Sequence, residues 1–322
     1  MLIYGAGLAG LLAANVFRRF VPTVCESQGK LPNNHGALLR FRTDRVGIAS
    51  NIPFKKVKVQ KAIKYDGKII TQPNIQLSNL YSQKVTGALL DRSINNLDSV
   101  ERYIAPWDLI NMLSRNCGIE YNLPLTMEDI TEANGVGVPI ISTIPMPVLM
   151  QIVKWRDIPK FPKQKIYTQT ARIEETECSV NQTIYYPDPL TNHYRVSVVG
   201  DTVISESIRN PDGSAGSNIM TILMEDFGIK PRKLVDIKDS SQEYGKIRPI
   251  DEQLRKQFIF EMTTKYNIYS VGRFATWRQL LMDDVVEDLQ IIENFLEKNS
   301  DYSRWMHSQK TWQETLTIKK GN

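Results

Sequence analysis

The sequence predicts an α/β protein with a discontinuous Rossmann-type nucleotide-binding domain and a mixed-sheet α+β domain. Three observations predict this fold class. Residues 5–10 form a glycine-rich turn after a short apolar strand, a second short strand ends at Glu26, and an apolar strand near the C-terminus runs into Gly272. A strand, a glycine turn and an acid about 20 residues later are typical of a dinucleotide site.

The composition is that of a globular protein. The 322 residues allow one large or two moderate domains, and 42% apolar with 23% charged residues excludes disorder, collagen and coiled coil. Cys25, Cys117 and Cys178 are too few for a disulfide framework, which favours the cytoplasm. The net charge of +5 permits anionic partners without requiring them.

Two apolar stretches could be mistaken for a membrane or export segment. Residues 2–17 have no basic segment before them and are interrupted by glycines. Residues 136–153 contain three prolines, which remove backbone donors where lipid offers no substitute. We therefore expect a soluble cytoplasmic protein without a membrane segment.

The N-terminal glycines have distinct physical tasks. Gly5 permits the tight turn from strand to helix, and Gly7 lets the backbone approach a pyrophosphate. Gly10 lets the helix pack closely on the strand. The first helical residues, Leu8 and Ala9, then present backbone N–H groups to the phosphates.

Glu26 ends the second strand, 21 positions after Gly5. A carboxylate at this separation binds a ribose 2′-hydroxyl, and it disfavours a 2′-phosphorylated cofactor. The following polar loop, 27–37, has no helical period, which suits a protein that wraps an extended flavin dinucleotide. The motif is an FAD/NAD(P)-binding one, and an NAD-dependent dehydrogenase remains an alternative at this point.

A strand over 268–271 meets Gly272-Arg273 near the C-terminus, and a helix is predicted to begin near Met282. Its apolar face recurs at spacings of four, three and four residues. Asp283 and Asp284 fall in its first turn, where the helix dipole favours carboxylates.

The segment 272–283, Gly-Arg-Phe-Ala-Thr-Trp-Arg-Gln-Leu-Leu-Met-Asp, resembles the closing flavin motif of UDP-galactopyranose mutases, which belong to the amine-oxidase-type FAD flavoproteins. The resemblance implies FAD as cofactor. It implies that Arg273 contacts the pyrophosphate and that amides near Met282 face the pyrimidine edge of the isoalloxazine. Gly36 and Arg42, in and after the polar loop, are further candidates for cofactor binding.

The resemblance covers about 1–43, 135–150 and 265–298, so the nucleotide-binding domain is predicted to be discontinuous. We assign 1–45, 131–154 and 263–300 to it. We assign 46–130 and 155–262 to a substrate domain, and 301–322 to a C-terminal tail. Strands between 183 and 204, with turns at Asp188-Pro189 and Gly200-Asp201, predict a sheet in the substrate domain.

Candidate substrate residues are arginines, which suit phosphates, and aromatic residues, which suit nucleobases or sugars. They are Tyr186, Arg195, Arg248, Trp277 and Arg278. Each could instead be a surface arginine or a core aromatic. His35 in the polar loop is a candidate acid or base. Arg40 could bind cofactor or substrate or only hold the loop. No metal-ligand spacing and no Ser/His/Asp arrangement is present, so no metal is expected.

The function expected from the resemblance is ring interconversion of a UDP-sugar through N5 of reduced flavin, on a nucleotide-linked small molecule. Two features depart from the mutase pattern: Gln279 stands where that pattern has a tyrosine, and the chain is compact. The alternative is an FAD-dependent amine oxidase or lyase acting on an aminoacylated thymidine base in phage DNA hypermodification, in the host cytoplasm. A flavin-binding sensor without turnover also remains open, as does the oligomeric state.

Overall fold

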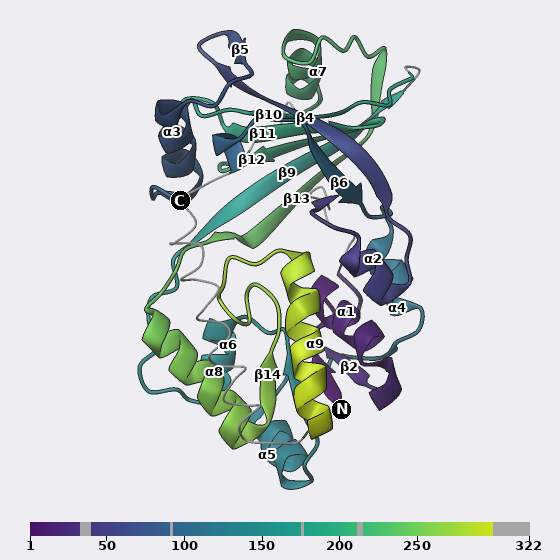
Figure 1. Ribbon diagram of the computed structural model, residues 1–322, viewed down its shortest axis with the longest axis vertical. Helices are drawn as coiled ribbons and strands as arrows, with labels where there is room; N and C mark the ends of the chain where they lie inside the picture. Colours follow the sequence, from purple (N-terminus) through teal and green to yellow (C-terminus); the bar gives the residue numbers. More distant parts are fainter. Residues whose placement is uncertain (33–39, 91–92, 175–176, 211–214, 299–322) are drawn as a thin grey trace.

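The computed structural model contains two sheets, one above the other in Figure 1, and describes residues 1–32, 40–90, 93–174, 177–210 and 215–298. His35, Gly36 and the segment 301–322 therefore lie outside the described residues. The predicted α/β class, with a parallel sheet and a second mixed sheet, is confirmed. None of the described helices combines the length and apolarity that crossing a membrane requires.

The lower sheet is wholly parallel, with the order β14-β8-β1-β2-β7. Its strands are β1 (Leu2–Tyr4), β2 (Thr23–Glu26), β7 (Gly118–Tyr121), β8 (Ile140–Ser142) and β14 (Ile268–Ser270). The strands expected near residues 2, 23 and 268 are confirmed. β1 is central, so the glycine turn that follows it opens at the carboxyl edge of the sheet, where parallel α/β sheets bind ligands.

Helices cover both faces of the parallel sheet. Ile3, Ile141 and Tyr269 pack toward one helical layer, while Tyr4 and Ile140 pack toward the other. The first layer contains α1 (Leu8–Val16), α2 (Arg45–Ser50), α4 (Leu109–Ser114) and α9 (Met282–Lys298). The second contains α5 (Met127–Gly135), α6 (Met146–Ile152) and α8 (Glu252–Tyr266). The predicted helix beginning near Met282 is confirmed as α9.

The upper sheet has nine strands in the order β13-β9-β12-β11-β10-β4-β6-β3, with β5 paired to β4. Its first members are β3 (Arg40–Phe41), β4 (Lys55–Tyr65), β5 (Lys68–Ile70) and β6 (Val100–Ile104). The others are β9 (Lys163–Glu174), β10 (Asn181–Tyr185), β11 (His193–Val199), β12 (Thr202–Ser207) and β13 (Lys233–Ile247). The strands predicted between 183 and 204 are confirmed as β10 to β12.

Two helices pack on the upper sheet at different places. α7 (Ala215–Glu225) covers one face, over a cluster that includes Ile184, Val196 and Val198. α3 (Ile75–Thr86) covers part of the opposite face through Tyr81. The rest of that opposite face is directed toward the parallel sheet (Figure 1). Short 3-10 turns at Arg18–Phe20 and Ser93–Asn95 complete the described elements.

Two elements pack on the parallel sheet although most of their residues were assigned to the substrate domain. β7 pairs with β2 at the edge of the parallel sheet, and α4 leads into it, although 106–130 were assigned to the substrate domain. α8 also packs on the parallel sheet rather than belonging with 155–262. The reason is that β7 is mostly exposed, so it carries no apolar run, and α8 has charged residues around much of its circumference. Neither therefore shows the periodicity that marks a core element.

Candidate functional site

The glycine turn after β1 leaves open space at one position only among its three glycines. A Cβ on Gly5, which has a φ of +102°, would lie 2.4 Å from Oγ1 of Thr143. A Cβ on Gly10 would lie 1.9 Å from the Gly5 carbonyl oxygen. At Gly7 a Cβ would meet no atom within 4 Å. Packing therefore requires Gly5 and Gly10, while Gly7 borders free space in front of the turn.

The first turn of α1 faces that free space. The helix begins at Leu8 with Gly7 as its N-cap, and no side chain of the described residues caps it. The first N–H groups of a helix have no partner inside the helix and carry the positive end of its dipole. The backbone of Leu8 and Ala9 is thus suited to hold an anion such as a pyrophosphate.

Glu26 binds the glycine turn directly. Its carboxylate accepts hydrogen bonds from the Ala6 N–H at 2.8 Å and from the Gln28 N–H at 2.9 Å. The side chain is almost buried. The carboxylate therefore stands beside the turn at the end of β2, the position from which a ribose hydroxyl would be bound.

The segment that follows β14 reaches the same place from the other end of the chain. Gly272 has a φ of +89°, and a Cβ on it would lie 3.0 Å from the Ala9 side chain in α1. The next residue, Arg273, donates from Nη2 to Oε1 of Gln279 at 3.0 Å. The structure thus brings 5–10 and 272–273 together, and it sets Arg273 beside the start of α1.

The N-terminus of α9 is tied to the segment that enters the upper sheet. The Asp283 carboxylate accepts hydrogen bonds from the backbone N–H groups of Arg42 and Thr43, each at 3.1 Å, and from the Thr43 hydroxyl at 2.5 Å. The side chain of Arg42 is exposed. Met282 is the first residue of α9, so its amide lies at this junction.

The arrangement fits the dinucleotide predicted from the sequence. Free space at Gly7, an uncapped helix start and a carboxylate at Glu26 match the needs of a pyrophosphate and a ribose. In the described parts of the chain no three or more His, Cys, Asp or Glu side chains are grouped so that they could hold a metal ion.

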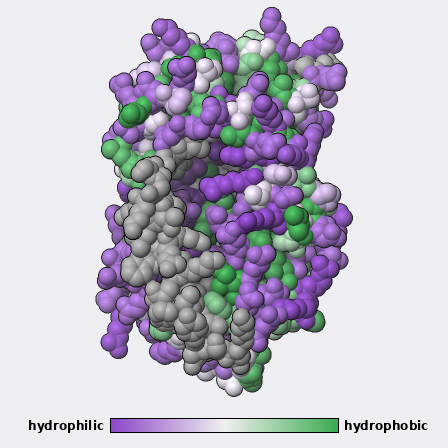
Figure 2. Space-filling view, in the orientation of Figure 1, coloured by the Kyte–Doolittle hydropathy of each residue, from purple (hydrophilic) through white to green (hydrophobic). Residues whose placement is uncertain are grey.

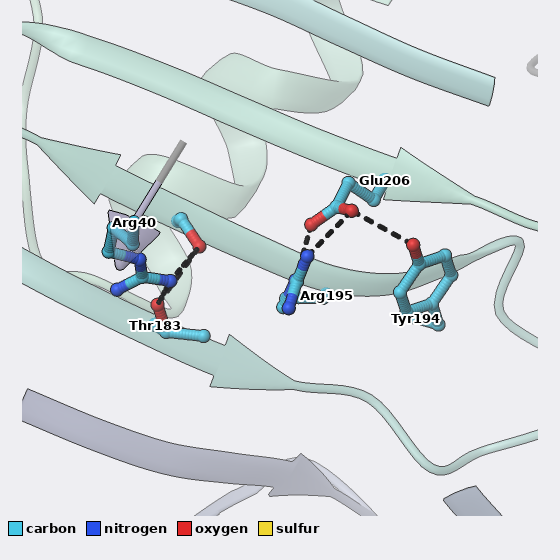
Figure 3. A network of polar contacts seen from close by, with 6 residues as sticks. Arg40, Thr183, Tyr194, Arg195 and Glu206 are labelled. Atoms are coloured by element: carbon cyan, nitrogen blue, oxygen red, sulfur yellow. Dashed lines mark hydrogen bonds and ion pairs between the residues drawn. The ribbon is translucent and has the colours of Figure 1, made fainter. Parts of the chain in front are cut away.

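A polar network lies on the upper sheet (Figure 3). Glu206 on β12 accepts from Arg195 on β11, through Nε and through Nη2 at 2.7 Å, and from the Tyr194 hydroxyl at 2.9 Å. Burial alone would raise the pKa of Glu206. The charge and hydrogen bonds of Arg195 outweigh it and lower the pKa to about 2. Arg195 and Glu206 therefore form a neutralised, fixed pair.

Arg40, on β3 of the same sheet, lies on the other side of this network from Tyr194 (Figure 3). Its Nη2 donates to the Thr183 hydroxyl at 2.7 Å and to the Ser197 hydroxyl at 3.2 Å. Burial, followed by the charge of Arg195, lowers the pKa of Arg40 to about 10. The partners of Arg40 are neutral, whereas the partner of Arg195 is an anion.

The other predicted substrate residues are not brought together. Tyr186 is buried in the cluster under α7 and donates to Asp226 at 2.8 Å, which places it on the far face of the sheet from Thr183. Trp277 is 2% exposed and donates from its indole N–H to the Arg248 carbonyl at 2.9 Å. Both aromatic rings therefore contribute to the hydrophobic cores.

The two remaining arginines have protein neighbours. Arg278 forms an ion pair with Asp288 of α9, and both side chains are 9% exposed. The guanidinium of Arg248 points to the end of α3, where a Cβ on Gly87 would lie 3.8 Å from Nη1. Arg278 thus joins the segment after β14 to α9, while Arg248 lies near the C-terminus of α3.

Sequence reasoning did not select Thr183, Ser197, Glu206 and Asp283. A pattern that marks part of this set is present in β11, where Arg195 and Ser197 alternate with buried valines. Such alternation predicts a strand with one polar face. Asp283 was interpreted through the helix dipole, while its contact to Arg42 and Thr43 links positions 240 residues apart.

Comparison with known proteins defines the fold. No family model and no curated protein matches the sequence. Reduced UDP-galactopyranose mutase is similar with a TM-score of 0.68 and 12% identity, over 94% of this chain and 95% of that one. A CLA-producing fatty acid isomerase from P. acnes gives a TM-score of 0.57 and 13% identity, over 91% and 98%. Aklavinone-11 hydroxylase, in a ternary complex with FAD and aklavinone, gives 0.50 and 10%, over 92% and 62%.

These likenesses extend over both sheets, since each covers more than nine-tenths of this chain. The chain accordingly has the Rossmann-type fold of FAD-binding flavoproteins, with a parallel nucleotide-binding sheet and a second mixed sheet. At identities of 10–13% the likeness is one of fold.

Proposed function

We propose that the chain binds FAD between the glycine turn of α1 and the start of α9 and works as an FAD-dependent enzyme. The observation that carries this proposal is the contact of Gly272 with Ala9, beside free space at Gly7. Two segments that are more than 260 residues apart in sequence meet where a dinucleotide would lie. The fold shared with the FAD complex of aklavinone-11 hydroxylase supports the same cofactor.

Each group at this site has a proposed task. The backbone of Gly5, Gly7 and Gly10 and the amides of Leu8 and Ala9 hold the pyrophosphate, and Glu26 binds the adenosine ribose. Arg273 adds a positive charge beside the pyrophosphate. The start of α9 at Met282 stabilises negative charge on the pyrimidine edge of the isoalloxazine. When bound, FAD would supply the redox chemistry that protein side chains do not offer. Gly36 and Arg42 are further proposed cofactor contacts, and His35 is the proposed acid or base.

For the reaction we propose ring interconversion of a nucleotide-linked sugar, supported by the similarity in fold to UDP-galactopyranose mutase. One observation counts against a nucleotide-diphosphate substrate and so keeps amine oxidation or lyase chemistry as the second candidate. Gln279, which replaces the tyrosine of the mutase motif, accepts from Arg273 and donates to the Ile247 carbonyl. This side chain braces the proposed pyrophosphate contact, and it offers no phenol to a nucleotide diphosphate.

The cofactor proposal is tested on purified protein by absorbance and by mass spectrometry of the released ligand. We expect a yellow protein with stoichiometric FAD. A colourless protein that takes up neither FAD nor FMN would overturn the proposal. If the released ligand is NAD and not FAD, the result would support the alternative of an NAD-dependent dehydrogenase.

The two reactions are separated by their redox needs. Ring interconversion of UDP-galactose should require reduction with dithionite beforehand and should consume no reductant. Amine oxidation, including that of an aminoacylated thymidine, should bleach the flavin anaerobically without added reductant. If the protein binds FAD but reacts in neither assay, it is a flavin-binding protein without turnover. That result would contradict the enzymatic part of the proposal.

A further inference from the structure

We propose that Arg40 binds one anionic group of the substrate, a carboxylate or a phosphate, and that Thr183 and Ser197 position its guanidinium. This inference rests on the proposed function, because the ligand is the substrate of that flavin site. The geometry comes from two hydrogen bonds, at 2.7 Å to Thr183 and 3.2 Å to Ser197. The two hydroxyls are 2.9 Å from each other, so they hold one edge of the guanidinium in a fixed orientation.

The charges around Arg40 do not balance. Glu206, the nearest acid in the network, is taken up by Arg195 and Tyr194. Among the residues that the structure describes, no carboxylate lies within ion-pair distance of Arg40. Hydroxyl groups orient a cation but do not neutralise it, and a partly buried charge without a counterion is costly. A ligand anion would supply the missing charge.

The remaining donors of Arg40 have the right form for such a group. Thr183 and Ser197 both accept from Nη2, which leaves Nε and Nη1 without an acceptor within the described part of the chain. A guanidinium presents these donors as a planar fork that matches carboxylate and phosphate oxygens. Because Arg195 is neutralised by Glu206, we expect one anionic group rather than two to be bound here.

The location ties this site to the cofactor site. Thr183 and Ser197 alternate with residues under α7, so they lie on the face directed toward the parallel sheet (Figure 1). Arg40 precedes by two residues the backbone that Asp283 holds at the start of α9. Figure 2 shows strongly hydrophilic side chains near the centre of the face, at the height where the two sheets adjoin in Figure 1. An anion on Arg40 would therefore be anchored next to the proposed isoalloxazine end.

The test measures anion binding directly, by calorimetry on the full chain with and without FAD. Sodium benzoate represents a carboxylate and phenyl phosphate a phosphate, at an ionic strength held constant with sodium chloride. We expect Arg40→Gln to weaken binding of the preferred probe by about tenfold or more, as loss of a charged hydrogen bond does, and Arg40→Lys to restore part of it. Arg172→Gln is the matched control, because Arg172 is an exposed arginine of the same sheet that pairs with Asp201 and Asp236.

Equal affinity of the wild type and Arg40→Gln for both probes would overturn the inference, as would no binding to the wild type. Should Arg40→Gln fail to fold, Thr183→Val removes one positioning hydroxyl and should also weaken binding, with the melting temperature as a check. FAD content is measured in the same samples. A protein that binds the anion but takes up no FAD would overturn the proposed function alone. A protein that binds FAD but neither anion would overturn this inference alone.

Discussion

At the scale of single residues, the three glycines of the N-terminal motif are under two different kinds of constraint. The protein itself excludes a Cβ at Gly5 and Gly10, because Thr143 and the Gly5 carbonyl occupy the space. Nothing in the described chain excludes one at Gly7, whose φ of −72° suits any residue. At Gly7 the missing side chain keeps open the space in front of the uncapped start of α1, which a pyrophosphate held on the backbone requires.

We therefore predict that Gly7→Val loses FAD but keeps the fold. Affinity should fall by roughly 100-fold or more, the factor that about 3 kcal/mol of lost binding produces. The melting temperature of the FAD-free protein should stay within about 2 °C of the wild type. Gly10→Ala is the contrast, and overpacking there should cost about 1–3 kcal/mol of stability even without cofactor. FAD titration and thermal unfolding measure both, and a Gly7→Val protein that binds FAD normally would contradict the assignment.

A second prediction at this scale concerns how the stability of the fold depends on pH through Glu206. Its pKa of about 2 lies below the ordinary 4.5, so the carboxylate is stabilised in the folded state. This contribution is complete above about pH 4.5 and is lost as the pH falls toward 2. It amounts to about 3 kcal/mol. Glu206→Gln should remove this acid dependence, and it should destabilise the protein at neutral pH because Arg195 would be left without its counterion. Urea unfolding between pH 3 and 7 measures this, and parallel profiles for the two proteins would count against it.

At the scale of elements, α9 does more than cover the sheet. Its first turn holds the backbone of Arg42 and Thr43 through Asp283, and its apolar face packs with α1 and α2. The helix thereby joins the N-terminal nucleotide-binding unit to the strand that carries Arg40. The start of α9 is thus fixed by side-chain contacts at the point where the proposed flavin edge would meet it.

We predict that Asp283→Asn loosens this junction. An amide has one acceptor oxygen where the carboxylate accepts three hydrogen bonds, so we expect a loss of about 1–3 kcal/mol in the free energy of unfolding. Asp284→Asn is a matched control in the same turn, since the Asp284 carboxylate accepts from the N–H of nearby Leu281. Its cost should be below about 1 kcal/mol. Equal losses in the two variants would show that the helix dipole, and not the link to Arg42 and Thr43, is what matters.

At the scale of the whole molecule, the sequence predicted what local physics determines. The apolar strands at 2–4 and 268–270 and the helix at 282 were predicted because an apolar run or a helical period marks each of them locally. β7 was missed because its residues are mostly exposed and only its pairing with β2 makes it a strand of this sheet. The network of Arg40 joins β3 to β10 and β11, which follow it by more than 140 residues. Contacts of that separation follow from topology, which no local pattern contains.

The convergence of the two chain ends makes a prediction for the whole molecule. A ligand that binds the folded state adds RT ln(1 + [L]/Kd) to its stability, and the gain is greatest in the segments that touch it. If FAD is held by both ends, adding it to FAD-free protein should slow amide hydrogen exchange in 5–10 and in 272–285 together, with equal dependence on FAD concentration. β5 (Lys68–Ile70), an exposed strand of the upper sheet, serves as the internal control and should not change. Gly7→Val treated with FAD should lose the protection in both segments at once, because one ligand links them. Protection confined to 5–10 would mean that a nucleotide binds the N-terminal unit alone and that the contact of Gly272 with Ala9 is only packing.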